Sequence, residues 1–187
     1  MAKQIWTYET LGQADRPTLE NILRTGSPPN LDELEGYIYC GWNHEWIGKL
    51  SGEKFKKGFK KRDGKLYGYN ERCHQDGMGY RGEWKSRQAP GKPPLALAFF
   101  RCTYFKDEPP DPFFEKYKHL SFFTYNLPMN SWYNLPFRVI RDAVVAPNEG
   151  DNSLLLSKAY LRVLPFVNLF YCYFLLGHRK KIEYEPW

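Results

Sequence analysis

The sequence has no apolar run long enough to form a membrane-spanning helix. Its most apolar part, residues 163–177, is 15 residues long and contains Pro165. A helix that crosses a bilayer needs roughly 20 predominantly apolar residues. Arg162 and His178 also bracket this stretch closely. We therefore expect no transmembrane segment.

Pro165 argues against a buried soluble helix as well, because a proline in a helix interior removes a hydrogen bond and clashes with the preceding turn. A β-hairpin explains the stretch better, and a single buried helix stays the alternative. We predict one strand over residues 154–163, a tight connection over 164–168 and a long final strand over 169–184.

The sequence also has no closely spaced cysteine pair, and we expect no secretory leader. The four cysteines, Cys40, Cys73, Cys102 and Cys172, lie far apart and form no CxxC pair. Their spacing therefore does not indicate a zinc site. The first residues, Met-Ala-Lys-Gln, carry no apolar signal segment. We expect reduced, mostly buried thiols in a cytoplasmic protein.

The familiar catalytic and cofactor motifs are absent. The sequence contains no GxSxG, Walker-type or GxGxxG pattern, and its four histidines form no HxH, HxxxH or HExxH pattern. A metal site would need ligands gathered from separate strands, which spacing alone does not reveal. We therefore expect no cofactor, and a haem bound by one of the histidines stays open as an alternative.

Aromatic residues, by contrast, are abundant. The 187 residues include 14 Tyr, 13 Phe and 6 Trp, an aromatic share of 18%. Aromatic side chains favour strands over helices, and this length is typical of one domain. The composition therefore favours a single β-rich domain.

The first 34 residues differ from the rest of the chain. Asp15 can cap a helix that extends to Gly26, and a second helical turn is predicted at residues 30–34. One amphipathic helix cannot build a core of its own. We therefore predict that residues 1–34 form an extension with a short helix, packed on a barrel domain of residues 35–187.

From residue 35 onward the turns are those of an antiparallel β-protein. Asp63-Gly64 separates two strand-like runs, residues 54–62 and 65–73, and this dipeptide is the strongest short-range hairpin signal. Closing a long meander removes its exposed edges. We predict an all-β, mainly antiparallel meander of 8–10 strands that closes into a barrel. The further strands are predicted at residues 36–42, 80–85, 95–105, 119–125 and 138–145.

Several charged residues interrupt the apolar strands. Arg101 and Arg141 lie within apolar runs, and Arg179 follows one. Burying a guanidinium without partners is costly, so each needs a carboxylate, a cage of carbonyls or a ligand anion. Asp142 adjoins Arg141, which indicates either a paired structural bridge or a catalytic carboxylate.

The net charge is +6, and residues 49–65 hold eight Lys or Arg among 17 positions. One interpretation is contact with a nucleic acid or an anionic lipid, with the interleaved aromatics stacking on bases. We favour a solvated edge hairpin, in which lysines discourage pairing between sheets. A nucleic-acid partner is therefore not expected.

The order of these elements resembles that of the lipocalin-like (calycin) barrels. A short N-terminal helix leads into a first strand that runs from Gly36 to Trp42; a string of hairpins follows, and a long aromatic final strand ends near Arg179. The resemblance spans residues 35–185. It implies a barrel that binds one small hydrophobic or amphipathic ligand, such as a lipid, a fatty acid or a pigment-like carboxylate, without catalysis.

The same cavity could instead belong to a small-molecule enzyme of the isomerase, cyclase or lyase type. In that alternative Asp142, Arg141 and Tyr160 are the acid–base and anion-holding groups. For the binding function, the residues predicted to contact the ligand are Trp42, Phe99, Arg101, Tyr125, Arg141, Tyr160 and Arg179.

Overall fold

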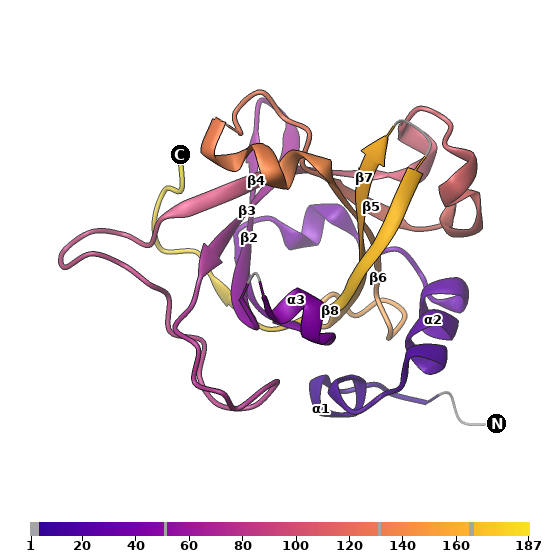
Figure 1. Cartoon of the computed structure of the whole chain (residues 1–187), viewed down its shortest axis with the longest axis horizontal. Helices are drawn as coiled ribbons and strands as arrows, with labels where there is room; N and C mark the ends of the chain where they lie inside the picture. The colour runs from indigo at the N-terminus through magenta and orange to yellow at the C-terminus, as the bar shows by residue number, and fades with distance from the viewer. Residues whose placement is uncertain (1–3, 51, 131, 165–166) are drawn as a thin grey trace.

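The structure, a computed structural model, is a closed antiparallel barrel with a short N-terminal helical layer (Figure 1). It describes residues 4–50, 52–130, 132–164 and 167–187. Each strand pairs with the next in sequence, and the last pairs with the first, so the predicted all-β meander is confirmed. The strands are β1 (Tyr37–Asn43), β2 (Lys54–Arg62), β3 (Lys65–Arg72), β4 (Ala96–Tyr104), β5 (Ser121–Thr124), β6 (Ile140–Val145), β7 (Leu155–Leu164) and β8 (Val167–Lys181).

The predicted N-terminal helix begins and ends where its capping residues indicate. The Asp15 carboxylate accepts a hydrogen bond of 2.9 Å from the Thr18 amide, and Gly26 follows the last helical residue. Such a cap satisfies one of the amides left unpaired in the first helical turn. The helices are α1 (Tyr8–Gly12), α2 (Arg16–Thr25), α3 (Trp46–Lys49) and the 3₁₀ turns η1 (Leu31–Leu34), η2 (Phe105–Asp107), η3 (Pro112–Tyr117) and η4 (Trp132–Val139).

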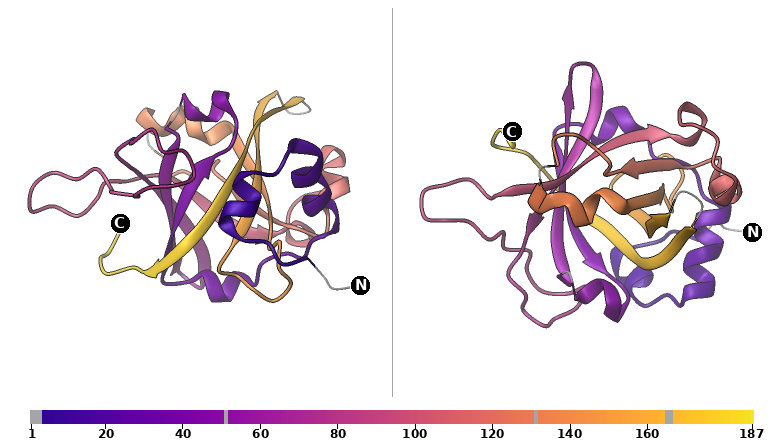
Figure 2. Two further views of the ribbon diagram at one scale, coloured as in Figure 1. Left: turned by 90° about the horizontal axis from the view of Figure 1, so that it is seen from below. Right: turned by 45° about the horizontal axis from the view of Figure 1, so that its top comes forward.

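Strand alternation divides the apolar side chains between two cores. Successive residues of a strand point to opposite faces, so β1 and β5 to β8 contribute to both cores, whereas β2, β3 and β4 contribute buried apolar side chains to the inner core. The outer core lies beneath α1, α2 and η3, which cover one side of the barrel (Figure 2). The inner core fills much of the barrel and includes Tyr39, Phe59, Phe100, Phe123, Leu155 and Leu176.

One end of the barrel is closed by η1, the purple turn behind the ring of strands in Figure 1. Leu31 and Leu34 are buried in the inner core beside Tyr39. The Tyr39 hydroxyl donates a hydrogen bond of 2.6 Å to the Asn152 carbonyl, which fastens the same end to the β6–β7 connection. Any cavity that opens to solvent must therefore lie toward the opposite end.

The prediction of a strand at residues 80–85 is wrong. The segment is a loop that wraps around Lys54, whose side chain is 1% exposed. The Lys54 ammonium is 2.7 Å from the Asp76 carboxylate and donates to the carbonyls of Arg81 and Glu83. Both carbonyls point toward this buried charge rather than toward a neighbouring strand, so the ammonium holds the loop in its path.

The final apolar stretch forms the hairpin that its sequence predicts. β7 and β8 pair over most of their length, although β7 extends to Leu164 and β8 begins at Val167. Within the expected connection, residues 165–166 lie outside the described residues. In the part of the chain that the structure describes, no helix is long and apolar enough to cross a membrane.

Close packing at Gly68 gives a test of the inner core. A Cβ atom at Gly68 would lie 2.1 Å from the Phe100 ring. We expect Gly68→Ala to lower the free energy of unfolding by about 1–3 kcal/mol, because an overpacked core must shift its side chains and backbone. Denaturant unfolding measures this change.

Gly64→Asn is the matched control. Gly64 lies in the β2–β3 turn at a positive φ, and a Cβ atom there would meet nothing within 4 Å. Asn tolerates this left-handed conformation, so near wild-type stability is expected. Equal stability of the two variants would contradict the described packing of Phe100 over Gly68.

Candidate functional site

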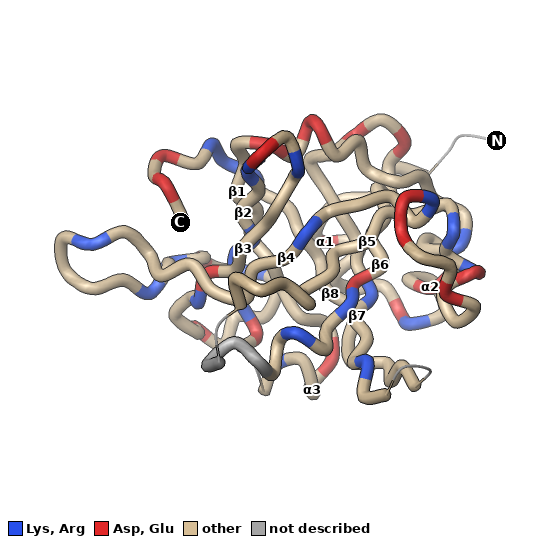
Figure 3. Tube along the Cα trace, turned by 90° about the horizontal axis from the view of Figure 1, so that it is seen from above, with Lys and Arg blue, Asp and Glu red and all other residues tan. Residues whose placement is uncertain are grey.

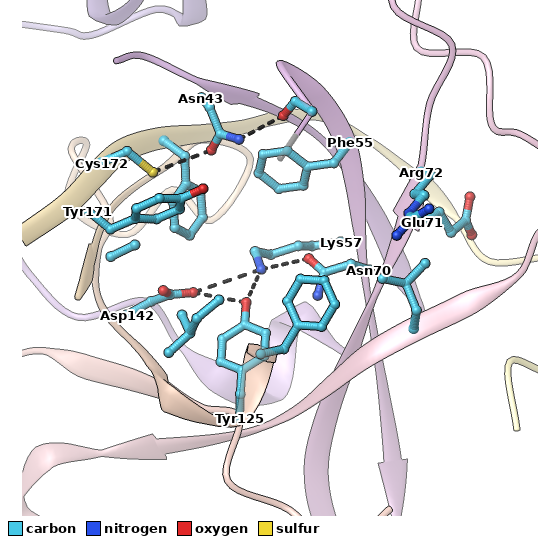
Figure 4. Close-up of a pocket in the computed structure, with 16 residues that line it drawn as sticks. Asn43, Phe55, Lys57, Asn70, Glu71, Arg72, Tyr125, Asp142, Tyr171 and Cys172 are labelled. Atoms are coloured by element: carbon cyan, nitrogen blue, oxygen red, sulfur yellow. Dashed lines mark hydrogen bonds and ion pairs between the residues drawn. The ribbon is translucent and has the colours of Figure 1, made fainter. Parts of the chain in front are cut away.

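A cavity of about 100 Å³ lies inside the barrel, at the end opposite η1 (Figure 4). We call it the barrel cavity. Its walls come from the ends of β1, β3 and β5, from the beginnings of β2, β4 and β6 and from the middle of β7 and β8, with a contribution from η4. Its described lining residues are Asn43, Gly52, Phe55, Lys57, Asn70, Glu71, Arg72, Leu97, Tyr125, Phe137, Ile140, Asp142, Ala159, Tyr171, Cys172 and Phe174.

Three polar groups meet at the base of the barrel cavity, as Figure 4 shows. The Lys57 ammonium donates hydrogen bonds to the Tyr125 hydroxyl and, at 2.8 Å, to the Asn70 side-chain carbonyl. The Tyr125 hydroxyl in turn donates to the Asp142 carboxylate at 3.0 Å. The nearest Asp142 oxygen is 3.8 Å from the ammonium. We call Lys57, Tyr125 and Asp142 the Lys57 centre.

The strand register brings Lys57 into this position. Phe55, Lys57 and Phe59 are two residues apart on β2, so all three point to the inner face. Asn70 lies directly opposite Lys57 on β3, which explains the hydrogen bond between their side chains. The Asn70 amide nitrogen also donates to the Ala98 carbonyl at 2.8 Å, so its oxygen is held toward the ammonium.

Four aromatic rings surround the Lys57 ammonium and replace part of its lost hydration. The nitrogen is 4.6 Å from the ring centroid of Phe100 and between 5.0 and 5.4 Å from those of Tyr125, Phe174 and Phe55. The face of each ring carries partial negative charge, and a desolvated ammonium gains roughly 2 kcal/mol from such a contact. The side chain is 4% exposed.

Burial shifts the acid–base properties of all three groups. It lowers the pKa of Lys57 to about 8, although the nearby Asp142 carboxylate opposes this shift. It raises the pKa of Asp142 to about 6, with Lys57 and the Tyr125 hydroxyl opposing. It also raises the pKa of Tyr125 well above its ordinary value. At pH 7 the predominant form is therefore an ammonium, a carboxylate and a neutral phenol.

One oxygen of this centre has no protein partner. Asp142 Oδ1 is buried and accepts no hydrogen bond from the described residues. An unpaired buried carboxylate oxygen is costly. A ligand in the barrel cavity that donates a hydrogen bond to this oxygen would remove that cost.

Of the residues predicted to act on a ligand, the structure places Tyr125 and Asp142 at the barrel cavity. Arg141 and Asp142 are adjacent on β6 and so face opposite sides of the sheet. Arg141 lies in the outer layer, 3.1 Å from Asp111 and over the rings of Phe114 and Phe122. The suggested bridge between Arg141 and Asp142 is therefore wrong, because neighbouring strand residues point apart.

The other predicted residues also lie outside the lining of the barrel cavity. Arg101 pairs with Glu108 at 2.7 Å, as expected for an arginine within an apolar strand. The Tyr160 hydroxyl is 3.2 Å from that of Tyr117 in the outer core. The remaining three lie on the outer face of the barrel. Trp42 donates a hydrogen bond to Glu53, Phe99 packs near Trp187, and Arg179 stacks over Tyr37.

Sequence reasoning missed Lys57, which belongs to the basic stretch assigned to a solvated hairpin. The signal was present in the spacing Phe55-x-Lys57-x-Phe59, which puts the lysine on an apolar face. Other lysines of the hairpin are paired at its surface: Lys60 with Glu185, and Lys61 with Asp32 at 3.0 Å. Figure 3 shows basic and acidic residues interspersed along the trace.

Comparison of the chain with protein-family models, with curated proteins and with solved structures gives no match. The likeness to lipocalin-like barrels therefore rests on the closed eight-stranded antiparallel meander. Among the described residues, no group of three or more His, Cys, Asp or Glu side chains could hold a metal ion. The four cysteines are free and buried.

The raised pKa of Asp142 makes stability depend on pH in a defined window. Between the ordinary value of 3.8 and about 6 the folded protein keeps a proton that the unfolded chain has lost. Stability conferred by this proton is therefore lost as the pH rises through the window. We expect wild type to lose on the order of 2 kcal/mol relative to Asp142→Asn between pH 4 and pH 6.

Denaturant unfolding of both proteins across this range measures the difference in stability. Taking the difference cancels the titration of groups that lie away from Asp142. Asp107→Asn, which removes an exposed carboxylate, is the control and should follow wild type. A constant difference between wild type and Asp142→Asn would contradict the assigned environment of Asp142.

Proposed function

We propose that the protein binds one small, largely apolar molecule with a single neutral polar group in the barrel cavity. One observation carries the proposal: an apolar-walled cavity contains a buried polar centre with an unused acceptor, Asp142 Oδ1. Mostly apolar walls with a few convergent polar groups are typical of small-molecule sites.

The volume of the barrel cavity limits the part of the ligand that it can enclose. At about 100 Å³ it is somewhat smaller than the engineered cavity of about 150 Å³ in another protein that holds benzene. The enclosed part is therefore the size of one small ring or a short alkyl chain. Phe55, Phe137 and Phe174 provide apolar and aromatic contacts for it.

Charge balance favours a neutral polar group over a carboxylate. The Lys57 ammonium and the Asp142 carboxylate already compensate each other at 3.8 Å. A bound carboxylate would leave one uncompensated buried negative charge, which is costly. A hydroxyl group can instead donate to Asp142 Oδ1 and add no charge, so alcohols and phenols fit best.

The two alternatives considered from the sequence, a small-molecule enzyme and a protein that contacts nucleic acid or anionic lipid, receive less support. Arg141 and Tyr160 lie in the outer layer, so the barrel wall separates them from Asp142 and the suggested catalytic group is not assembled. The basic hairpin offers no continuous row of free lysines, since Lys54 and Lys57 are buried.

Substitution of Ala159, whose side chain lines the barrel cavity, tests the proposal with benzyl alcohol as the probe. Ala159→Leu fills the cavity and should weaken binding about tenfold or more, which corresponds to at least about 1.4 kcal/mol. Ala159→Gly leaves the space open and is the matched control. Isothermal titration calorimetry measures both affinities, and circular dichroism checks that both variants are folded.

Benzyl alcohol that fails to bind wild type, or that binds Ala159→Leu as well as wild type, would contradict the proposal. A second readout uses the natural ligand. Native mass spectrometry of protein purified from its own source should show a mass above that of the denatured chain.

A further inference from the structure

We propose that Lys57 forms a reversible imine with a small apolar aldehyde held in the barrel cavity. The inference rests on the proposed ligand binding and names a substrate class for the same site. It is carried by the position of the amine, by the groups that hold it and by the Tyr125 hydroxyl and Asp142 carboxylate next to it.

The position of Lys57 distinguishes it from the other lysines. It is the one lysine among the described residues that line the barrel cavity. Lys54 is buried to a similar degree but is held by Asp76 and by the carbonyls of Arg81 and Glu83, outside that lining. A carbonyl compound in the cavity would therefore meet a single amine.

The surroundings of Lys57 favour the neutral amine, which is the nucleophilic form. Desolvation in an apolar pocket is one of the ways in which proteins activate a lysine toward carbonyl compounds. With a pKa of about 8, about a tenth of the side chains are neutral at pH 7. Asn70 and Tyr125 hold the nitrogen at the base of the cavity in the resting state.

The reaction needs a proton donor for the carbonyl oxygen; the Tyr125 hydroxyl is that donor, and the Asp142 carboxylate takes up a proton from the attacking amine. The nitrogen lone pair attacks the carbonyl carbon, and the π electrons of the C=O bond move to oxygen, which takes up a proton. The resulting carbinolamine loses water as the C=N bond forms. Both hydrogens of the water derive from the amine, by way of Asp142 and the Tyr125 hydroxyl, 3.0 Å apart, and no group is oxidised or reduced.

The size and polarity of the barrel cavity select the aldehyde. An aldehyde carries one hydrogen rather than a second carbon substituent on the reacting carbon, so it fits about 100 Å³ better than a ketone of equal length. It is neutral, as the Lys57–Asp142 charge balance requires.

The test uses benzaldehyde as the probe and sodium cyanoborohydride as the trap. The trap delivers a hydride to the imine carbon and fixes the adduct as a secondary amine. Intact-mass analysis should show one added benzyl group per chain, and peptide mapping should place it on Lys57. Labelling of Lys57 should proceed about tenfold or more faster than that of exposed lysines, and its rate should rise between pH 6 and pH 8 as the amine loses its proton.

Two variants control for reaction at the surface. Lys57→Met should lose the fast adduct, whereas Lys56→Met, in which the adjacent outward-facing lysine is replaced, should keep it. If Lys57→Met does not fold, the peptide map of wild type still decides the question. Adducts spread over exposed lysines, without preference for Lys57, would overturn the inference.

Benzyl alcohol separates failure of this inference from failure of the proposed function. It has the same ring as benzaldehyde but no carbonyl group, and it should slow the labelling of Lys57 by competition. If it binds while Lys57 stays unlabelled, the imine is refuted and the binding function stands. If neither compound enters the barrel cavity, both are refuted.

Discussion

The structure depends most on one interaction, the burial of the Lys57 ammonium inside the barrel. Removing an ammonium from water costs several kcal/mol even after the protein relaxes. The cost is offset by Asp142, by the hydroxyl of Tyr125, by the side chain of Asn70 and by four aromatic rings. These partners come from strands spread around the barrel, so side chains from distant parts of the sheet contact the same ammonium. The same charge keeps part of the interior polar and incompletely filled.

The outer layer has a polar cluster of its own, and the difference between the two is informative. Although burial raises the pKa of Glu20, hydrogen bonds from Lys158, Tyr117, Tyr173 and Arg24 bring it down to about 2. Both carboxylate oxygens of Glu20 are hydrogen-bonded, and the cluster joins α2 to the barrel. In the barrel cavity, by contrast, one oxygen of Asp142 accepts no hydrogen bond from the residues that the structure describes. The satisfied cluster joins α2 to the barrel, and the unsatisfied one is the site that we propose for a ligand.

Much of the fold could be predicted from local signals. The Asp15 cap and the Asp63-Gly64 turn each determine structure within a few residues, and both are confirmed, as is the pairing of the last two strands. The segment at residues 80–85 was mistaken for a strand because its path is set by Lys54, which is distant in sequence. Local propensity does not contain that information.

The candidate site was harder to predict because it depends on strand register. Tyr125 and Asp142 were recognised from the sequence, yet Asp142 was assigned to its neighbour Arg141 rather than to Lys57. A shift of one residue moves a side chain to the other face of a sheet. Lys57 lies among other lysines, and its buried state follows from partners on β3, β5 and β6 that only the closed barrel brings together.

A crystal structure of the protein with benzyl alcohol at pH 7 tests the central claim most directly. The account predicts density for one ring in the barrel cavity, with its hydroxyl group within hydrogen-bond distance of Asp142 Oδ1 and with Lys57 still held by Asn70. A cavity filled by its own side chains, or a Lys57 side chain turned out to solvent, would contradict it.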